Sequence, residues 1–488
     1  MRIKKAAQER CKMEISIGGV VRGEDFFNQE KLMDTLRDVL KRSSVLLVAP
    51  RRAGKTSVMQ KLLDEQDLYP GFSIKYYNCH TLGELQTVYS EIQVCAAAHL
   101  SDTEDKILII ILDEFSSIID YMLRDQQKNE VIRVLRLFKG LRDNPVYNTK
   151  VRFIIGGSTS IDMVLRSINA SDLIGDFYRL PVEPFDAETM KMYLEAILPP
   201  KHIDLEPNAN ELIIQLFQKS YPYFINLLIA ALKHRYIGKI SKADVIRTYR
   251  EHVITGEGAN HFSYFYERVQ KYGLVKKSHI RATREILATI AAIGELDEND
   301  AFDLFQKYTR SHDKACFDNL MADLENEFYV ARRYGSIKYY FAIDVMREWW
   351  KRWHPPEDKA YISEAFITMK KDGSHIYYKI HGNSILSKDP ELISSMQTAL
   401  LMYTRDIGFT TPLKKVEFEG ESWLISTGDA LVLSCKVIGR GSTRKIEEKM
   451  KNVVHDVEIE YAESLDKWDG NVNTFSDIGK NIDTLFRW

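Results

Sequence analysis

The sequence predicts an α/β protein built on a parallel sheet, with helical and mixed α+β segments behind it. Three observations predict this class. Short, wholly apolar runs of strand type occur at 45–48 and 107–112, and a third strand is expected at 151–155. Segments with apolar residues at helical spacing separate these runs. The first run leads directly into a loop that ends Gly-Lys-Thr at 54–56, and a helix follows.

Composition limits the possible classes of protein. A chain of 488 residues, 45% hydrophobic and 28% charged, predicts two to four globular domains. The formal net charge of −2 gives no overall basic footprint for nucleic acid. The five cysteines have no C-x-x-C pair, which favours reduced thiols over a disulfide framework or a zinc site: Cys11, Cys79, Cys95, Cys316 and Cys435.

The sequence shows no membrane segment. Its longest apolar run, 107–112, is far too short to span a bilayer, and the basic start at 1–15 lacks the apolar core of a signal peptide. We therefore expect a cytoplasmic protein without a membrane partner.

Strand, loop and helix at 45–63 form a P-loop arrangement. Gly54 has no Cβ, so backbone N–H groups can close around phosphate oxygens at the positive end of the helix. Lys55 can reach the β- and γ-phosphates, and the Thr56 hydroxyl can bind Mg²⁺. The usual first glycine is replaced by Ala49. We expect the ATP-binding residues of this segment to be Pro50, Arg51, Arg52, Ala53, Gly54, Lys55, Thr56 and Ser57.

An acidic pair, Asp113-Glu114, ends the apolar run at 107–112. Such pairs are common at protein surfaces, but this one follows the P-loop by one strand and one helix. Asp113 can hold hydrated Mg²⁺, while Glu114 can orient or deprotonate the attacking water. We therefore predict Asp113 and Thr56 as metal-binding residues, and Glu114 and Lys55 as catalytic residues.

The run at 151–155 breaks at Gly156-Gly157-Ser158-Thr159-Ser160. In P-loop ATPases with an extra strand between the two motifs (the ASCE type), this strand end supplies a polar sensor of the γ-phosphate. Ser158 or Thr159 could serve here, although a turn rich in Gly and Ser needs no such reason. The other expected core elements are a helix at 31–41, a strand at 72–79, helices at 82–100 and 129–142, and a strand at 177–182.

The rest of the chain divides at changes of pattern. We expect an ATPase core at 1–183, a helical lid at 184–275, a winged helix at 276–356 and an α+β module at 357–488. Asp186 is the expected N-cap of the first lid helix.

The order of motifs resembles the archaeal-type ATPases and their STAND, or AAA-like, P-loop relatives over residues 20–355. The matching segments are VRGEDFFNQE, APRRAGKTS, IIILDEF, GGSTS, LPVEPFD and SYPYF. The resemblance implies that Arg51 and Arg52 belong to the phosphate loop and that Pro222 lies near the nucleotide. It places Asn28-Gln29-Glu30 against adenine, where relatives carry Gly-Arg-Glu. Arg166 and Arg179 are its candidates for an arginine finger.

The third helix expected in the winged helix, 313–327, carries five acids and one lysine. Phosphates repel such a helix, so DNA binding is possible but not favoured, despite Arg332, Arg333 and Lys338 on the expected wing. Beyond 357, the element order resembles a longin/roadblock module, which implies a protein partner or self-association.

These observations lead to one functional hypothesis and two alternatives. The hypothesis is an ATP-hydrolysing switch, with ATP and Mg²⁺ as cofactors, that couples nucleotide state to assembly or partner binding. The alternatives are a DNA-associated ATPase helper and a non-hydrolysing nucleotide-binding scaffold of a prokaryotic defence system.

Overall fold

The computed structural model describes residues 17–27, 29–79, 85–100, 106–157, 161–270, 277–333, 335–380, 413–418 and 421–486, and positions 395, 398 and 399. The chain forms two compact units. The first contains 1–277, 313–330 and 342–344, and the second contains 278–312, 331–341 and 345–488. Two sets of expected site residues lie outside the described residues: Asn28, and the sensor candidates Ser158 and Thr159.

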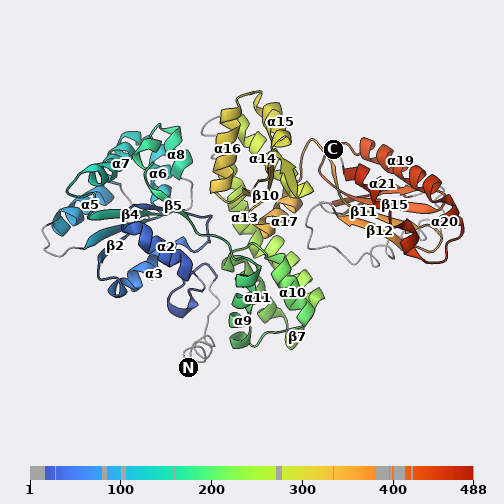
Figure 1. The fold of residues 1–488 in the computed structure, drawn as a ribbon, viewed down its shortest axis with the longest axis horizontal. Helices are drawn as coiled ribbons and strands as arrows, with labels where there is room; N and C mark the ends of the chain where they lie inside the picture. Colours follow the sequence, from blue (N-terminus) through green and yellow to red (C-terminus); the bar gives the residue numbers. More distant parts are fainter. Residues whose placement is uncertain are drawn as a thin grey trace. The chain divides into compact units, whose positions relative to one another are not determined.

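A five-stranded parallel sheet forms the centre of the first unit (Figure 1). Its strand order is β2-β3-β4-β1-β5, so β4 lies between the P-loop strand β1 and the acidic strand β3. The strands are β1 (Val45–Val48), β2 (Phe72–Asn78), β3 (Ile107–Asp113), β4 (Val151–Ile155) and β5 (Tyr178–Pro181). This arrangement confirms the predicted α/β class, with a parallel sheet of ASCE type.

Helices cover both faces of this sheet (Figure 1). One face packs on α2 (Glu30–Leu40) and α3 (Lys55–Asp64). The other packs on α5 (Leu85–Leu100), α6 (Phe115–Arg124), α7 (Lys128–Asp143) and α8 (Ile161–Ser167). Because strand residues alternate between faces, Ile109 and Ile111 pack toward α3, while Ile110 and Leu112 pack toward α6 and α7. The burial on both faces explains the apolar residues of β1 and those of β3 up to Leu112.

Helices follow β5 in the first unit. They are α9 (Ala187–Ile197), α10 (Pro207–Leu216), α11 (Pro222–Arg235), α12 (Lys242–Thr248) and α13 (Glu257–Arg268), with a π-helical turn at Tyr249–Ile254. Asp186 caps α9, as predicted, by accepting a hydrogen bond from the Thr189 backbone N–H at 2.8 Å. The same unit includes α16 (Lys314–Asn326).

The second unit contains two sheets. The first has the order β8-β10-β9, with β8 (Glu295–Asp297), β10 (Lys338–Phe341) and β9 (Val330–Arg332). Its helices are α14 (Lys277–Ile293), α15 (Glu298–Thr309) and α17 (Asp344–Trp353). The second sheet is antiparallel in the order β12-β11-β15-β14-β13: β11 (Tyr361–Met369), β12 (His375–Ile380), β13 (Lys415–Phe418), β14 (Glu421–Thr427) and β15 (Leu431–Ile438).

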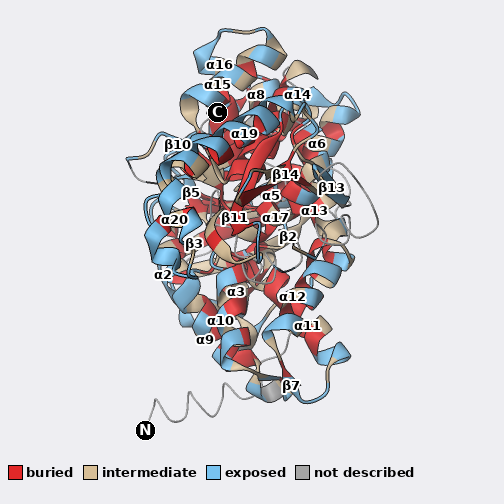
Figure 2. Ribbon diagram, turned by 90° about the vertical axis from the view of Figure 1, so that its right-hand side faces the viewer, coloured by how far each residue is buried: buried red, intermediate tan, exposed pale blue. Residues whose placement is uncertain are grey.

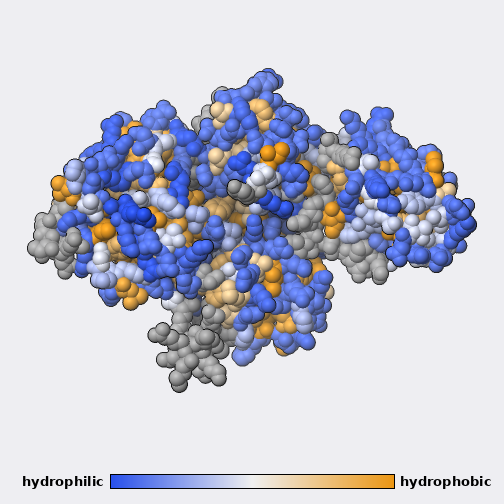
Figure 3. Space-filling model, in the orientation of Figure 1, coloured by the Kyte–Doolittle hydropathy of each residue, from blue (hydrophilic) through white to orange (hydrophobic). Residues whose placement is uncertain are grey.

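One face of the antiparallel sheet packs on α19 (Arg444–Glu460), α20 (Ala462–Asp466) and α21 (Gly479–Asp483) (Figure 1). Figure 2 shows the buried residues gathered in the strands and on the inner sides of the helices. On the face shown in Figure 3, apolar residues lie scattered in a mainly hydrophilic surface. Among the described residues, no helix is long and apolar enough to cross a membrane.

Candidate functional site

The phosphate-loop candidates lie between β1 and α3. Gly54 occupies the N-cap position of α3 with φ +92°, in the left-handed region that favours glycine. A Cβ at this position would have no atom within 4 Å, so backbone conformation rather than space accounts for glycine here. Arg52, in the same loop, also has a positive φ of 69°. The turn therefore presents backbone N–H groups at the start of the helix, where an anion is stabilised.

Lys55 folds back over this loop. Its side chain is buried, and its Nζ donates to the carbonyl oxygens of Ala49 at 2.6 Å and Pro50 at 2.8 Å. Burial lowers the pKa of Lys55 to about 8, and the positive charge of Arg268 lowers it further, while Glu114, Asp113 and Glu327 act in the opposite direction. The ammonium is thus held at the loop by backbone acceptors that a phosphate oxygen can replace.

Asp113 is buried at the end of β3, and both of its carboxylate oxygens accept a hydrogen bond. Oδ1 accepts from the Glu114 backbone N–H at 2.9 Å, and Oδ2 accepts from the Tyr76 hydroxyl at 2.9 Å. Each oxygen has a second lone pair, so the carboxylate keeps its capacity to bind a cation.

Glu114 follows at the N-cap position of α6 with φ +55°, a left-handed conformation that is uncommon for a non-glycine residue. Its Oε2 accepts a hydrogen bond from the Ser117 hydroxyl at 2.7 Å. The side chain lines the same cavity as Gly54, Lys55 and Thr56. The structure therefore brings the acidic pair and the phosphate loop together, although the two segments are almost 60 residues apart.

This cavity has a volume of about 410 Å³, within the range of small-molecule sites. Its far end is aromatic. Phe27 lies 5.3 Å from Tyr193 and 6.2 Å from Phe185, between ring centroids. Pro222, the first residue of α11, also lines the cavity, as does Gln29. One end of the cavity is thus suited to phosphate and the other to a flat, apolar ring.

Two polar contacts support the aromatic end. The Tyr193 hydroxyl donates to Asn226 Oδ1 at 2.8 Å, and the Tyr221 hydroxyl donates to the Val182 carbonyl at 3.0 Å. Burial raises the pKa of Tyr193 to about 12, so its hydroxyl stays protonated. These contacts hold the start of α11 against the strand end after β5.

The two arginines of the loop lie on aromatic rings. The Arg51 guanidinium is 4.6 Å from the Tyr264 ring centroid, and that of Arg52 is 5.0 Å from the Tyr223 centroid. A Cβ at Gly18 would lie 2.0 Å from Arg52 Nη1, so the chain before α2 passes close to this guanidinium. Sequence reasoning found both arginines but not the rings that hold them.

Ser57 has a structural contact of its own. It is buried, and its hydroxyl accepts a hydrogen bond from the Val21 backbone N–H at 3.0 Å. Arg22 Nη2 donates to Gln60 Oε1 at 3.0 Å. These bonds attach the segment before α2 to α3, and that segment forms one wall of the cavity.

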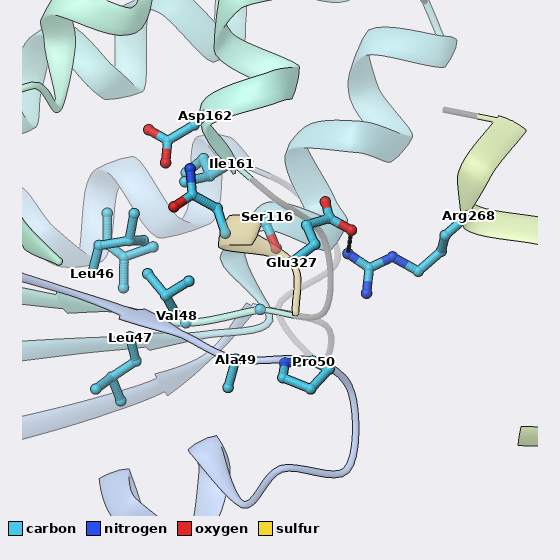
Figure 4. A pocket seen from close by; sticks show the side chains of 14 residues that line it. Leu46, Leu47, Val48, Ala49, Pro50, Ser116, Ile161, Asp162, Arg268 and Glu327 are labelled. Atoms are coloured by element: carbon cyan, nitrogen blue, oxygen red, sulfur yellow. Dashed lines mark hydrogen bonds and ion pairs between the residues drawn. The ribbon is translucent and has the colours of Figure 1, made fainter. Parts of the chain in front are cut away.

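A second, smaller hollow lies beside the P-loop and is shown in Figure 4. Ala49, Pro50 and Gly157 line it together with Arg268 of α13 and Glu327, which follows α16. Arg268 Nη2 donates to Glu327 Oε2 at 2.6 Å, and each side chain is only 4% exposed. A Cβ at Gly157 would meet Ser116 Oγ at 1.9 Å, so this turn packs tightly on the start of α6.

Arg166 and Arg179, the arginine-finger candidates, both form ion pairs within the first unit. Arg166 pairs with the buried carboxylate of Asp323 on α16. Arg179 Nη2 contacts Asp162 Oδ1 at 2.5 Å. The two candidates are thus engaged with carboxylates of their own chain.

Arg268, Glu327 and Tyr76 carry no local signal in the sequence. Arg268 ends a helix of mixed polarity, and Glu327 looks like one more acid of an acidic helix. Tyr76 meets Asp113 only because β2 pairs with β3 in the register Asn78↔Asp113. Strand pairing and helix packing, rather than a motif, bring these residues to the site.

The oxygen ligands present are of the kind that suits Mg²⁺. The Thr56 hydroxyl and the Asp113 carboxylate fit a cation that takes one or two protein oxygens and completes its shell with water and phosphate. Among the described residues there is no cluster of three or more His, Cys, Asp or Glu side chains able to hold a metal ion. A cage formed by protein ligands alone is therefore absent from the described part of the chain.

No protein-family model matches the chain, and no curated protein matches it significantly. Solved structures are similar in fold. A Walker-type ATPase of Pyrococcus abyssi is 15% identical with a TM-score of 0.46, over 68% of this chain and 98% of that one. The ORC2 protein of Aeropyrum pernix, solved as ADPNP–ADP complexes, is 13% identical with a TM-score of 0.40, over 69% and 93%.

The RuvB Holliday junction branch migration motor of Thermotoga maritima is 16% identical with a TM-score of 0.32, over 64% of this chain and 93% of that one. Likeness at this level concerns the fold alone. The strand order of the first unit, with a Gly-Lys-Thr loop after β1 and an acidic pair after β3, makes this a P-loop ATPase fold.

Proposed function

We propose that this chain binds ATP with Mg²⁺, hydrolyses the ATP, and uses the nucleotide state as a switch. One observation carries the proposal: Gly54, Lys55, Thr56 and Glu114 line a single cavity whose other end is aromatic. ATP needs such a site, because its triphosphate binds a phosphate loop and its purine ring packs on aromatic side chains.

The proposed roles follow from the contacts of each side chain. Lys55 exchanges its bonds to the Ala49 and Pro50 carbonyls for bonds to phosphate oxygens. Backbone N–H groups at Gly54 and the start of α3 stabilise the phosphate charge. Phe27, Tyr193 and Pro222 hold the adenine ring, with Gln29 at the cavity wall.

Glu114 is the proposed base. Its carboxylate lies at the N-terminus of α6, held there by the Ser117 hydroxyl, and it orients or deprotonates the attacking water. Thr56 and Asp113 would hold Mg²⁺, which when bound neutralises charge on the phosphate oxygens. Ser158 and Thr159 remain proposed γ-phosphate sensors from sequence alone.

The proposed switch is supported by the ion pair between Arg268 and Glu327. Arg268 lies close enough to the P-loop for its charge to lower the Lys55 pKa. A triphosphate brings negative charge to the same place, attracts Arg268 and repels Glu327. ATP would thereby weaken the ion pair that attaches α16 to α13, because Glu327 directly follows α16.

We propose that the chain has the four domains expected from the sequence: an ATPase core at 1–183, a helical lid at 184–275, a winged helix at 276–356 and a C-terminal module at 357–488. The element order α14-β8-α15-α16-β9-β10 supports the proposed winged helix, and the antiparallel sheet with α19 supports the proposed interaction module of longin/roadblock kind. A protein partner or self-association through this module would read the nucleotide state.

The test compares wild type with Lys55→Ala and with Lys61→Ala, a matched control on the same helix whose lysine pairs with Glu65. We expect wild type and Lys61→Ala to bind ATP and hydrolyse it, and Lys55→Ala to bind no ATP. Equal ATP binding by all three proteins would refute the proposed site. Light-scattering mass with and without ATP tests the switch, because a nucleotide-driven assembly changes mass.

A further inference from the structure

Tyr76 lies beside the proposed metal ligand and has no role in the function proposed so far. It lies on β2, the edge strand next to β3, and its hydroxyl donates to Asp113 Oδ2 at 2.9 Å. Asp113 is only 2% exposed, so solvent cannot supply the same bond. The tyrosine is therefore built into the surroundings of this carboxylate.

A second polar side chain lies near the Tyr76 hydroxyl. The Gln60 side chain, on α3, interacts with this hydroxyl and lowers its pKa. The Gln60 carbonyl oxygen accepts a hydrogen bond from Arg22 Nη2 at 3.0 Å, which fixes the position of the amide. The Tyr76 hydroxyl therefore lies between Gln60 and the Asp113 carboxylate.

The chemistry fixes the direction of the bond to Asp113. An ionised carboxylate can only accept a hydrogen bond, so the Tyr76 hydroxyl is the donor to Asp113. The Glu114 backbone N–H occupies Oδ1 at 2.9 Å. With one donor on each oxygen, the carboxylate plane has little freedom to rotate, and its remaining lone pairs keep one direction.

We propose that Tyr76 is a positioning residue that orients the Asp113 carboxylate for a divalent cation and so sets the affinity of the site for Mg²⁺. This inference rests on the proposed function, because it assigns the cation to the ATP site. Donors beside a metal-binding carboxylate typically change metal affinity by about 10- to 100-fold. Tyr76 is not among the residues that line the cavity, so we expect nucleotide binding without metal to be independent of its hydroxyl.

The chain offers a matched control next to Tyr76. Tyr77 is also on β2, but it points to the opposite face of the sheet, where it packs in the cluster that contains Cys95. Tyr77→Phe removes the same atom from the same strand without touching Asp113. The two variants thus separate loss of a hydroxyl in general from loss of this particular hydrogen bond.

The experiment measures binding of a non-hydrolysable ATP analogue by fluorescence, first with EDTA and then across a Mg²⁺ titration. We expect Tyr76→Phe to bind the analogue as wild type does in EDTA. In the titration, it should need an Mg²⁺ concentration about 10-fold higher to reach half of the Mg²⁺-dependent fluorescence change. Tyr77→Phe should match wild type in both. Electron paramagnetic resonance with Mn²⁺ and the same analogue gives an independent reading of cation affinity.

A double variant tests the route of the effect. Asp113→Asn removes the carboxylate charge, so adding Tyr76→Phe to it should cause no further loss of Mg²⁺ affinity. Should Tyr76→Phe fold poorly, Gln60→Met removes the side-chain amide beside the Tyr76 hydroxyl and is expected to weaken Mg²⁺ binding in the same direction. Binding of the ATP analogue in the presence of EDTA shows that each variant is folded.

The outcomes are distinguishable. An unchanged Mg²⁺ requirement in Tyr76→Phe, with a clear metal effect in wild type, overturns this inference and leaves the proposed function standing. Additive losses in the double variant also overturn it, because Tyr76 would then act independently of Asp113. Absence of analogue binding in wild type would overturn the proposed function and this inference together.

Discussion

Arg268 and Glu327 form a buried ion pair, with 2.6 Å between Nη2 and Oε2 and 4% exposure of each side chain. The pair joins the end of α13 to the residue after α16, next to the P-loop (Figure 4). A buried pair gains little net free energy when intact, but removal of one partner leaves the other charge without compensation. This asymmetry makes the pair sensitive to a third charge such as phosphate.

Glu327→Gln is expected to destabilise the protein, because it leaves the Arg268 charge buried without its carboxylate. The expected loss in free energy of unfolding is about 3–5 kcal/mol, measured by urea unfolding. ATP should stabilise this variant more than it stabilises wild type, since the phosphates supply the missing negative charge.

Asp318→Asn is the matched control for this first prediction. Asp318 lies on the same helix, but it is exposed and pairs with Lys314 at 3.0 Å, so its loss should change stability by less than about 0.5 kcal/mol. The switch hypothesis loses its support if ATP stabilises Glu327→Gln and wild type equally.

Asp323 leads to a second prediction, on pH. Burial raises its pKa to about 6 from 3.8, the charges of Glu327 and Asp162 raise it further, and pairing with Arg166 lowers it. The folded state therefore holds the proton more tightly than the unfolded chain. Between about pH 4 and pH 6, stability from this group falls as pH rises, and it is absent above pH 6.

Asp323→Asn carries no titrating group at this position. The difference in free energy of unfolding between variant and wild type should shift in favour of the variant by about 3 kcal/mol from pH 4 to pH 7. Urea unfolding of both proteins at several pH values measures this difference. A difference that stays constant over this range would mean that the Asp323 carboxylate is not strained by its burial.

The P-loop and the acidic pair could be predicted from sequence because each is a local pattern. Four of the five residues of Val151–Ile155 are apolar because both faces of β4 are buried, and the predicted bounds of this strand agree with the structure. The Gly54-Lys55-Thr56 loop follows its strand directly. Such features need no knowledge of distant residues.

Other features depend on tertiary contacts. The acidic helix expected at 313–327 is present, but its sequence does not show that two of its acids, Asp323 and Glu327, are buried and paired with arginines. The helix α13 lies within the helical lid expected at 184–275, but its bounds were not predicted, and Arg268 was missed. The aromatic end of the cavity combines Phe27, Phe185 and Tyr193 from segments that no spacing rule connects.

A third prediction concerns DNA. Two cations of the β9–β10 region are paired with carboxylates, Arg332 with Glu298 at 3.6 Å and Lys338 with Glu295 at 2.6 Å. A third, Arg333, lies 5.9 Å from the Tyr340 ring centroid. We expect the full chain to show no sub-micromolar binding of duplex DNA at physiological salt in fluorescence anisotropy. The double variant Glu295→Gln/Glu298→Gln frees both cations and should bind DNA more strongly at low salt. Tight wild-type binding with a steep salt dependence would favour the DNA-associated alternative.

The last prediction separates the roles of the two acidic residues. Glu114→Gln keeps the size of the side chain and can still contact Ser117, but it removes the base. ATP should therefore bind as in wild type, while the hydrolysis rate should fall by about 10²-fold or more. Asp113→Asn should instead raise the Mg²⁺ concentration required for binding, because it removes the charge at the metal position.

Rapid-quench measurement of ATP hydrolysis, together with analogue binding, distinguishes these outcomes. The control is Glu130→Gln, an exposed acid on α7 that pairs with Arg133 and should behave as wild type. A hydrolysis rate that is unchanged in Glu114→Gln would remove this residue from the mechanism. If wild type hydrolyses no ATP and Glu114→Gln behaves identically, the non-hydrolysing scaffold becomes the better description. If Glu114→Gln accumulates an ATP-bound assembly of larger mass, nucleotide state and assembly are coupled through this site.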